Sequence, residues 1–140
     1  MLEKSVVLNG FNKRCKNTLM ETLDIEYIDV GDDFLVAKMP VNTKVHQPYG
    51  LLHGGATAAL AESVGSAASA FFVDSTKFIV KGIELTINHL KSVKEGEVIA
   101  TATIIHKGRS THLWEIKVVN ESGDLISISK LTNIILEKNK

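Results

Sequence analysis

The chain of 140 residues carries sixteen basic and sixteen acidic side chains, so its formal net charge is zero, and it has a single cysteine, Cys15. Zero net charge argues against a broad nucleic-acid surface, and one cysteine excludes both an intrachain disulfide and a CxxC metal pair. The N-terminal segment, with its early acidic residue and short apolar stretch, is unlike a signal peptide, and no run of about 18 residues is apolar enough to span a membrane.

We therefore expect one cytoplasmic domain over residues 1–140, without a bound metal and without nucleic-acid or membrane partners. The first 23 residues are mixed in character, and KNTLMETL is their best short helix. From Asp33 onward, FLVAKMPV alternates as a strand does, and Pro40 near its end favours an edge position because proline has no backbone N–H. The one long helical segment that we predict runs from Leu51 to Phe72.

Four segments rich in Ile, Val and Thr follow this helix: KFIVKGIELTINHLKSV, EVIATATIIHK, THLWEIKVVN and DLISISKLTNIILE. Apolar and polar residues alternate in them with a period of two, and short turns that contain glycine separate the later ones. One strand, one long helix and four further strands predict an α+β arrangement, in which a mainly antiparallel sheet wraps the helix.

The long helix has one charged residue, Glu62, in its middle. Its expected sheet-facing stripe consists of Leu60, Val64, Ala67 and Phe71. Glu62 lies about 200° from Leu60 around the helix and points to the other side. The residues that we assign to that side are small: Ala58, Ala59, Gly65, Ser66 and Ser69. Most helix glutamates are solvated surface residues. A face of small residues favours instead a second chain or a ligand above it, with Glu62 as a base or nucleophile.

The helix begins at His53-Gly54-Gly55. The first backbone N–H groups of a helix have no intrahelical partner and can polarise a carbonyl, although two glycines are also consistent with a merely flexible entry. Gly54 and Glu62 are eight residues apart, so they lie ~12 Å apart along the helix axis. A base or nucleophile must come within about 3–3.5 Å of the polarised carbon. If both residues act, they belong to different subunits, and the protein is a dimer with two equivalent sites.

The segment HGGATAALAESVGSAAS, preceded by QPYGLL, resembles the hot-dog-fold acyl-CoA thioesterases of the phenylacetate-type and 4-hydroxybenzoyl-CoA (Arthrobacter-type) branch. KNTLMETLDIEY, KFIVKGIELTINHLKSV and HKGRSTHLWEI are similar to further segments of that family, in the same order along the chain. The resemblance implies a hot-dog fold, in which a five- or six-stranded mainly antiparallel sheet wraps a long central helix. It also implies a homodimer that can pair into a tetramer, and no cofactor, since coenzyme A is part of the substrate.

The resemblance implies a role for five residues around the thioester. Glu62 would attack the thioester or activate water, and the Gly54 N–H would polarise its carbonyl. His53 and Gln47 would position the thioester and the water, and Ser66 would help to orient the water. Gln47, His53 and Gly54 would come from one chain, and Glu62 and Ser66 from the other.

The resemblance also implies a coenzyme A site. It would consist of Gly82, the segment His89, Leu90, Lys91 and Ser92, and the turn His106, Lys107, Gly108, Arg109, Ser110 and Thr111. Lys91, Lys107 and Arg109 can meet phosphates, although such residues are also ordinary at solvated turns. The sequence departs from the family at His112, where Gln is common, and at 90–93, where Arg-Pro is common. We assign Trp114, Phe71 and Phe72 to packing.

The sequence does not identify the acyl group of the substrate. An aromatic acyl group, such as hydroxybenzoyl, phenylacetyl or dihydroxynaphthoyl, is our first expectation, and a medium-chain or β-keto fatty acyl group is the nearest alternative. Two other classes remain: a hot-dog hydratase or dehydratase, for which His53 and Glu62 would serve as the proton-transfer pair, and a non-enzymatic acyl-CoA sensor. The sequence does not decide between nucleophile and general base for Glu62.

Overall fold

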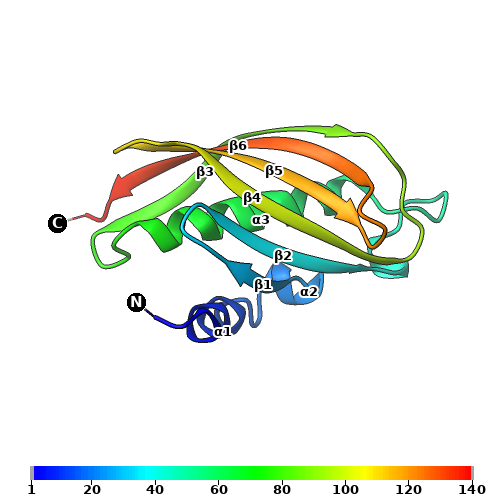
Figure 1. Cartoon of the computed structure of the whole chain (residues 1–140), viewed down its shortest axis with the longest axis horizontal. Coiled ribbons are helices and arrows are strands. Elements are labelled where there is room, and N and C mark those ends of the chain that lie inside the picture. Colours follow the sequence, from blue (N-terminus) through cyan, green and yellow to red (C-terminus); the bar gives the residue numbers. More distant parts are fainter. Residues whose placement is uncertain (1, 140) are drawn as a thin grey trace.

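The computed structural model describes residues 2–139 (Figure 1). Its elements in chain order are α1 (Lys4–Arg14), α2 (Leu19–Thr22), β1 (Glu26–Val30), β2 (Phe34–Val41), the short 3-10 helix η1 (Thr43–Val45), α3 (Gly54–Phe72), β3 (Phe78–His89), β4 (Gly96–Lys107), β5 (Thr111–Asn120) and β6 (Leu125–Glu137). Within this range no helix is both long and apolar enough to cross a membrane.

The six strands form one sheet in the order β1-β2-β4-β5-β6-β3, and every neighbouring pair is antiparallel. The helix α3 lies along one face of this sheet and contacts every strand from β2 to β6 (Figure 1). The predicted α+β arrangement of a long helix wrapped by an antiparallel sheet is therefore confirmed. One edge of the sheet is β3, which pairs only with β6 among the described residues.

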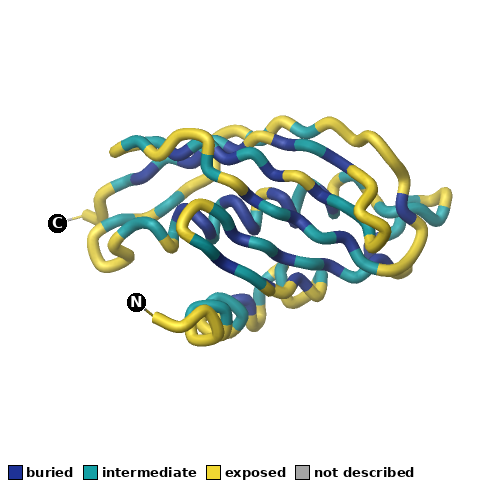
Figure 2. The backbone as a smooth tube through the Cα atoms, viewed as in Figure 1, coloured by how far each residue is buried: buried dark blue, intermediate teal, exposed yellow. Residues whose placement is uncertain are grey.

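The core fills the space between the sheet and α3. The strands β2, β4 and β5 alternate between buried and more exposed residues, as the period of two predicts (Figure 2). Trp114, Leu35 and Met39 are fully buried there, and complete burial of a large apolar side chain contributes roughly 1.5–3 kcal/mol. Ala100 and Ala102 on β4 leave room for this packing. By contrast, most residues of the β3 edge are exposed.

The buried face of α3 differs from the predicted one. Leu60 and Val64 are buried, but Ala67 is only half-buried and Phe71 is 42% exposed, so the end of the expected stripe is wrong. Two residues assigned to the opposite side, Gly65 and Ser69, are instead buried. A Cβ on Gly65 would lie 2.6 Å from Leu131 of β6, so the glycine lets the sheet approach closely. Small residues on α3 pack against large residues on the sheet. Hydrophobic periodicity does not predict this packing, because it takes no account of side-chain volume.

The N-terminal part contains two elements that were not predicted from the sequence, the helix α1 and the strand β1. The first helix is α1, while KNTLMETL contributes only the single turn α2. The strand β1 makes β2 the second strand of the sheet rather than its edge. However, β1 pairs with β2 only from Leu35 to Lys38. Pro40 lies beyond this pairing, so its missing N–H costs no bond on that side.

Candidate active site

The N-terminus of α3 is capped by His53. Its Nδ1 accepts a hydrogen bond from the Gly55 N–H at 2.7 Å, and its carbonyl accepts from the N–H groups of Ala56 and Thr57. Among residues 2–139, Gly54 therefore carries the one N–H of the first turn that has no acceptor. This donor lies at the positive end of the helix dipole, where negative charge is stabilised.

The His89 ring lies close to Gly54, so a side chain at this position would have to displace it. A Cβ at this position would lie 2.9 Å from Nε2 of His89, at the end of β3. A cavity of about 340 Å³ opens beside Gly54, and its lining includes Gln47, Lys91 and Ser92. The Gln47 side chain is itself fixed, because its Oε1 accepts a hydrogen bond from the backbone N–H of Tyr49. The chain thus brings together the predicted residues Gln47, Gly54 and His89, with Leu90, Lys91 and Ser92 beside them.

Glu62 lies in a different and larger cavity, of about 700 Å³, that it shares with Ser66. This cavity lies between α3 and the N-terminal elements, and the rest of its lining is mostly apolar, with aromatic side chains from Phe11, Tyr27 and Phe78. Glu62 is exposed in the isolated chain. Its Oε1 rests over the β3 residue Gly82, where a Cβ would approach it to 2.7 Å.

One chain does not bring Gly54 and Glu62 together. They line separate cavities, and their positions in the same helix correspond to ~12 Å along its axis. The open edge strand β3 is close to both residues, since Gly82 lies under Glu62 and His89 lies against Gly54.

Apart from Gly82, which lies within β3, the predicted coenzyme A residues fall into two groups at opposite ends of the molecule. The segment His89 to Ser92 lies near the start of α3, whereas the turn between β4 and β5 lies near its end (Figure 1). In this turn Lys107 sits over the ring of Phe72, with its Nζ 4.3 Å from the ring centroid. Gly108 is required there, because a Cβ would approach the carbonyl oxygen of Thr111 to 2.9 Å.

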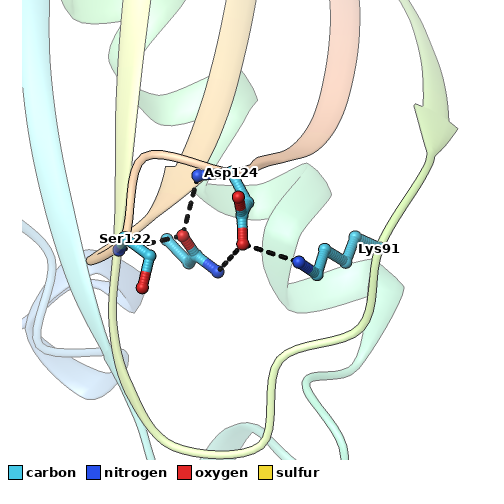
Figure 3. A network of polar contacts seen from close by, with 4 residues as sticks. Lys91, Ser122 and Asp124 are labelled. Carbon is cyan, nitrogen blue, oxygen red and sulfur yellow. Dashed lines mark hydrogen bonds and ion pairs between the residues drawn. The ribbon is translucent and has the colours of Figure 1, made fainter.

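Lys91 already has a partner within the chain (Figure 3). Its Nζ lies 2.6 Å from Oδ2 of Asp124, which also accepts from the side chain of Asn120. The Asn120 Oδ1 in turn accepts from the backbone N–H groups of Ser122 and Asp124. The hydrogen bond from Lys91, followed by that from Asn120, holds the pKa of the Asp124 carboxyl below its usual value. A phosphate bound to Lys91 would have to compete with this pair, which is exposed and therefore weak.

A buried polar cluster that the sequence did not predict lies beneath α3. The Ser69 hydroxyl is within hydrogen-bonding distance of Trp114 Nε1 at 2.7 Å, Asn133 Nδ2 at 2.8 Å and His112 Nδ1 at 3.0 Å. Burial, followed by the charges of Lys107 and His106, lowers the pKa of His112. The signals in the sequence were the polar residues Ser69 and Asn133 and the departure from the family at His112.

Comparisons with known proteins agree on one family. Residues 49–127 match the family described as Thioesterase superfamily. The chain is 40% identical over 134 residues to the proofreading thioesterase EntH of Cronobacter turicensis, covering 96% of this chain and 97% of that one. It is 37% identical over 134 residues to the 1,4-dihydroxy-2-naphthoyl-CoA hydrolase of Escherichia coli, with 96% and 98% covered.

Solved structures show the same likeness in three dimensions. A mutant of thioesterase PA1618 from Pseudomonas aeruginosa superimposes with a TM-score of 0.92 and 40% identity, covering 94% of each chain. Thioesterase HI1161 from Haemophilus influenzae gives a TM-score of 0.90 and 37% identity, with 93% of this chain and 90% of that chain covered.

Proposed function

This chain is a thioester hydrolase with the hot-dog fold that belongs to the thioesterase superfamily, and we propose that it cleaves an acyl-CoA at a site shared between two subunits. The observation that carries this proposal is the separation of Glu62 from Gly54 into two cavities of one chain. Each cavity holds half of the groups that thioester hydrolysis needs, so two chains complete each other.

The half around Gly54 polarises the thioester. The unpartnered N–H of Gly54 points to the developing oxyanion, which a preorganised donor at a helix start stabilises. Because Nδ1 of His53 accepts a hydrogen bond, its neutral ring carries the proton on Nε2, which is available to donate to the thioester or to water. Gln47 lines the neighbouring cavity and positions the same groups.

The half around Glu62 supplies the carboxylate of the partner subunit. Acting as a base, it takes a proton from water while the water oxygen bonds to the carbonyl carbon. The C–S bond then breaks, and the coenzyme A thiolate leaves and is protonated. Acting as a nucleophile, Glu62 forms a mixed anhydride that water later hydrolyses. Ser66, one helical turn beyond Glu62, helps to orient the water. The reaction needs no further cofactor.

The edge strand β3 provides a route to this dimer. Its outer side has no neighbour among the described residues, and an open edge of twelve residues invites pairing with a second copy. Consider a two-fold antiparallel pairing that sets Gly82 opposite His89 of the partner subunit. Since Gly82 lies under Glu62 and each His89 lies against its own Gly54, this register brings Glu62 toward Gly54 of the partner subunit. Coenzyme A then lies along β3, between the 106–111 turn of one subunit, which is near its own Gly82, and the 89–92 segment of the other subunit.

For the acyl group we propose an aromatic unit, as in the phenylacetate and 4-hydroxybenzoyl branch. The cavity beside Glu62 is lined by Phe11, Tyr27 and Phe78, whose rings can pack on a flat acyl group. The relative from Escherichia coli, named for a naphthoyl-CoA substrate, supports the same class. Tyr27 is held in place by a hydrogen bond from its hydroxyl to the Ser63 carbonyl.

Thiol release from a panel of benzoyl, hydroxybenzoyl, phenylacetyl, hexanoyl and palmitoyl thioesters of coenzyme A tests the activity and the acyl class together. We expect an aromatic thioester to be preferred. A preference for hexanoyl-CoA would redirect the acyl assignment to medium chains, and enoyl-CoA hydration without thiol release would replace the proposed reaction by that of a hydratase.

Mixing two inactive variants tests the shared site. Glu62→Gln and Gly54→Pro each damage one half, and proline is tolerated in the first turn of a helix. After subunit exchange, half of the dimers are mixed and carry one intact site of two, so about a quarter of the wild-type activity returns. Mixing Glu62→Gln with a second inactive variant of the same half, Glu62→Ala, is the matched control. If both mixtures remain equally inactive while exchange is verified, the shared site is wrong.

A further inference from the structure

The buried polar cluster under α3 has a fixed hydrogen-bond direction. A hydroxyl offers two acceptor lone pairs and one proton. Trp114 Nε1 and Asn133 Nδ2 can only donate, so they occupy both lone pairs of Ser69. The Ser69 proton is then donated to Nδ1 of His112, whose neutral ring carries its own proton on Nε2. Every donor and acceptor atom in contact with the Ser69 hydroxyl therefore has a partner in this one arrangement.

The side chain of Asn133 is held from its nitrogen side. Nδ2 donates to the Gly65 carbonyl at 3.1 Å and to Ser69 Oγ at 2.8 Å. A flipped amide would place two acceptor oxygens against each other at Gly65, so the orientation of the amide is determined. Asn133 is fully buried, and its Oδ1 has no hydrogen-bond partner among the described residues. A buried acceptor without a donor costs roughly 1–3 kcal/mol, so this oxygen calls for an explanation.

The unpartnered oxygen borders the gap above Gly82, which Glu62 also borders. Asn133 pairs with Gly82 across the β3–β6 ladder. The position that a Gly82 Cβ would occupy lies 2.7 Å from Glu62 Oε1 and 3.5 Å from Asn133 Oδ1. The two oxygens can therefore be no farther apart than ~6 Å, and a hydrogen bond between them requires the Glu62 side chain to rotate toward Asn133.

We propose that Asn133 is a positioning residue for Glu62, and that its Oδ1 accepts a hydrogen bond from the carboxyl group when Glu62 is protonated. An ionised carboxylate and an amide oxygen are both acceptors and repel each other, whereas a protonated carboxyl group can donate to the amide. Asn133 thus stabilises Glu62 in the form that it adopts after taking a proton from water. This inference rests on the proposed role of Glu62 as the base.

Other ionisable groups lie near Glu62 or near Gly82. Arg14, Cys15, Tyr27 and Lys138 line the cavity with Glu62, and Lys81 and Glu84 flank Gly82 on β3. Burial raises the pKa values of Cys15 and Tyr27, so neither is charged at neutral pH. In the proposed dimer His53 of the partner subunit also faces Glu62. For this reason the protonation of Glu62 is read from its own carbon resonance rather than from a pH–rate curve.

The test is a titration of the Glu62 side-chain carboxyl carbon by NMR in protein labelled with [13C]glutamate, with the resonance assigned by its loss in Glu62→Gln. The decisive variant is Asn133→Leu. It leaves no buried partner unsatisfied, because Ser69 still binds Trp114 and His112, and the Gly65 carbonyl keeps its bond within α3. We expect the titration midpoint of Glu62 to move to lower pH. A midpoint that stays in place or rises overturns the inference.

A second variant tests the same contact from its other side. Gly82→Ala adds a Cβ that displaces the Glu62 carboxyl from the gap and leaves the bonds of Asn133 intact, so the midpoint should again move to lower pH. The matched control is Ser127→Ala, which removes the other buried oxygen without a partner on β6 and should leave the midpoint unchanged. If the control shifts as far as Asn133→Leu does, the effect is a general one and the inference fails.

The titration requires no enzymatic turnover, so it separates this inference from the proposed function. If Glu62→Gln loses thioester hydrolysis, the proposed function is supported. If the midpoint of Glu62 also stays in place in both Asn133→Leu and Gly82→Ala, the role of Asn133 is rejected. If the midpoint shifts in both variants but the protein hydrolyses no thioester, the contact between Asn133 and Glu62 is supported and the proposed function is rejected.

Discussion

The two halves of the proposed site are built in opposite ways. Around Gly54 the chain itself supplies the contacts: His53 caps the helix, the Gln47 side chain is bonded to its own turn, and the His89 ring lies beside the glycine. Around Glu62 the chain leaves a wide apolar cavity and an exposed carboxylate. A donor must be in place before charge develops, whereas an acyl group and a partner subunit must first enter the other half.

The largest expected effect on activity comes from replacing the Glu62 carboxylate, in the half of the site with the wide cavity. Glu62→Gln should reduce kcat by about 10²–10⁴-fold, the range associated with loss of a general base or acid. Because Glu62 is exposed in the isolated chain and forms no ion pair among the described residues, the same change should alter the free energy of unfolding of each subunit by no more than ~0.5 kcal/mol. Steady-state thiol release and thermal unfolding measure the two. Glu95→Gln, at another exposed carboxylate, is the control, and retained activity in Glu62→Gln would contradict the assignment.

A substitution at Gly54 should have a smaller effect on activity, and the size of that effect should depend on His89. Gly54→Ala places a Cβ 2.9 Å from Nε2 of His89 and should lower kcat/KM about tenfold, since the donor and the imidazole move apart. In a His89→Ala background the collision is absent, so the added loss from Gly54→Ala should shrink. A double-mutant cycle of kcat/KM measures this coupling. Equal losses in both backgrounds would show that the contact with His89 is irrelevant.

Of the two kinetic parameters, a change in the 106–111 turn should affect KM and leave kcat unchanged. Lys107→Met removes a charge that can meet a phosphate, and a threefold to tenfold rise in KM is expected, roughly 1 kcal/mol, with kcat unchanged. Loss of the cation–π contact with Phe72 should cost about 0.5–1 kcal/mol of stability. Lys44→Met, which removes a surface ion pair with Asp24, is the control. An unchanged KM would leave Lys107 as a packing residue alone.

The smallest effect concerns stability at acidic pH. Burial lowers the pKa of His112 below its ordinary 6.5, so the unfolded chain binds a proton there more readily than the folded one. Stability is therefore lost as the pH falls below 6.5 and through the lower pKa of the folded state. His112→Gln should flatten this decline, measured as Tm between roughly pH 7 and 5. His46→Gln is the control, and an equal decline in wild type and His112→Gln would contradict the prediction.

Much of the fold followed from local patterns. The alternation in the four later segments predicted their strands, and the long helix predicted from Leu51 to Phe72 is present but begins at Gly54. The short strand β1 was missed because five residues, EYIDV, carry too little alternation to stand out. The end of the helix stripe was wrong because hydrophobicity favours Phe71, whereas the sheet packs closely on Gly65, Ala68 and Ser69.

The sequence by itself determined the proposed division of the site, because helix rise is a property of the backbone and sets Gly54 and Glu62 ~12 Å apart in any fold that keeps the helix. Only the tertiary structure decided what surrounds each of them. The contact of Gly82 with Glu62, the contact of His89 with Gly54 and the bond from Asn133 to Ser69 join residues that are far apart in the chain. Strand order and side-chain volume create these contacts, and neither is encoded in the spacing of neighbouring residues.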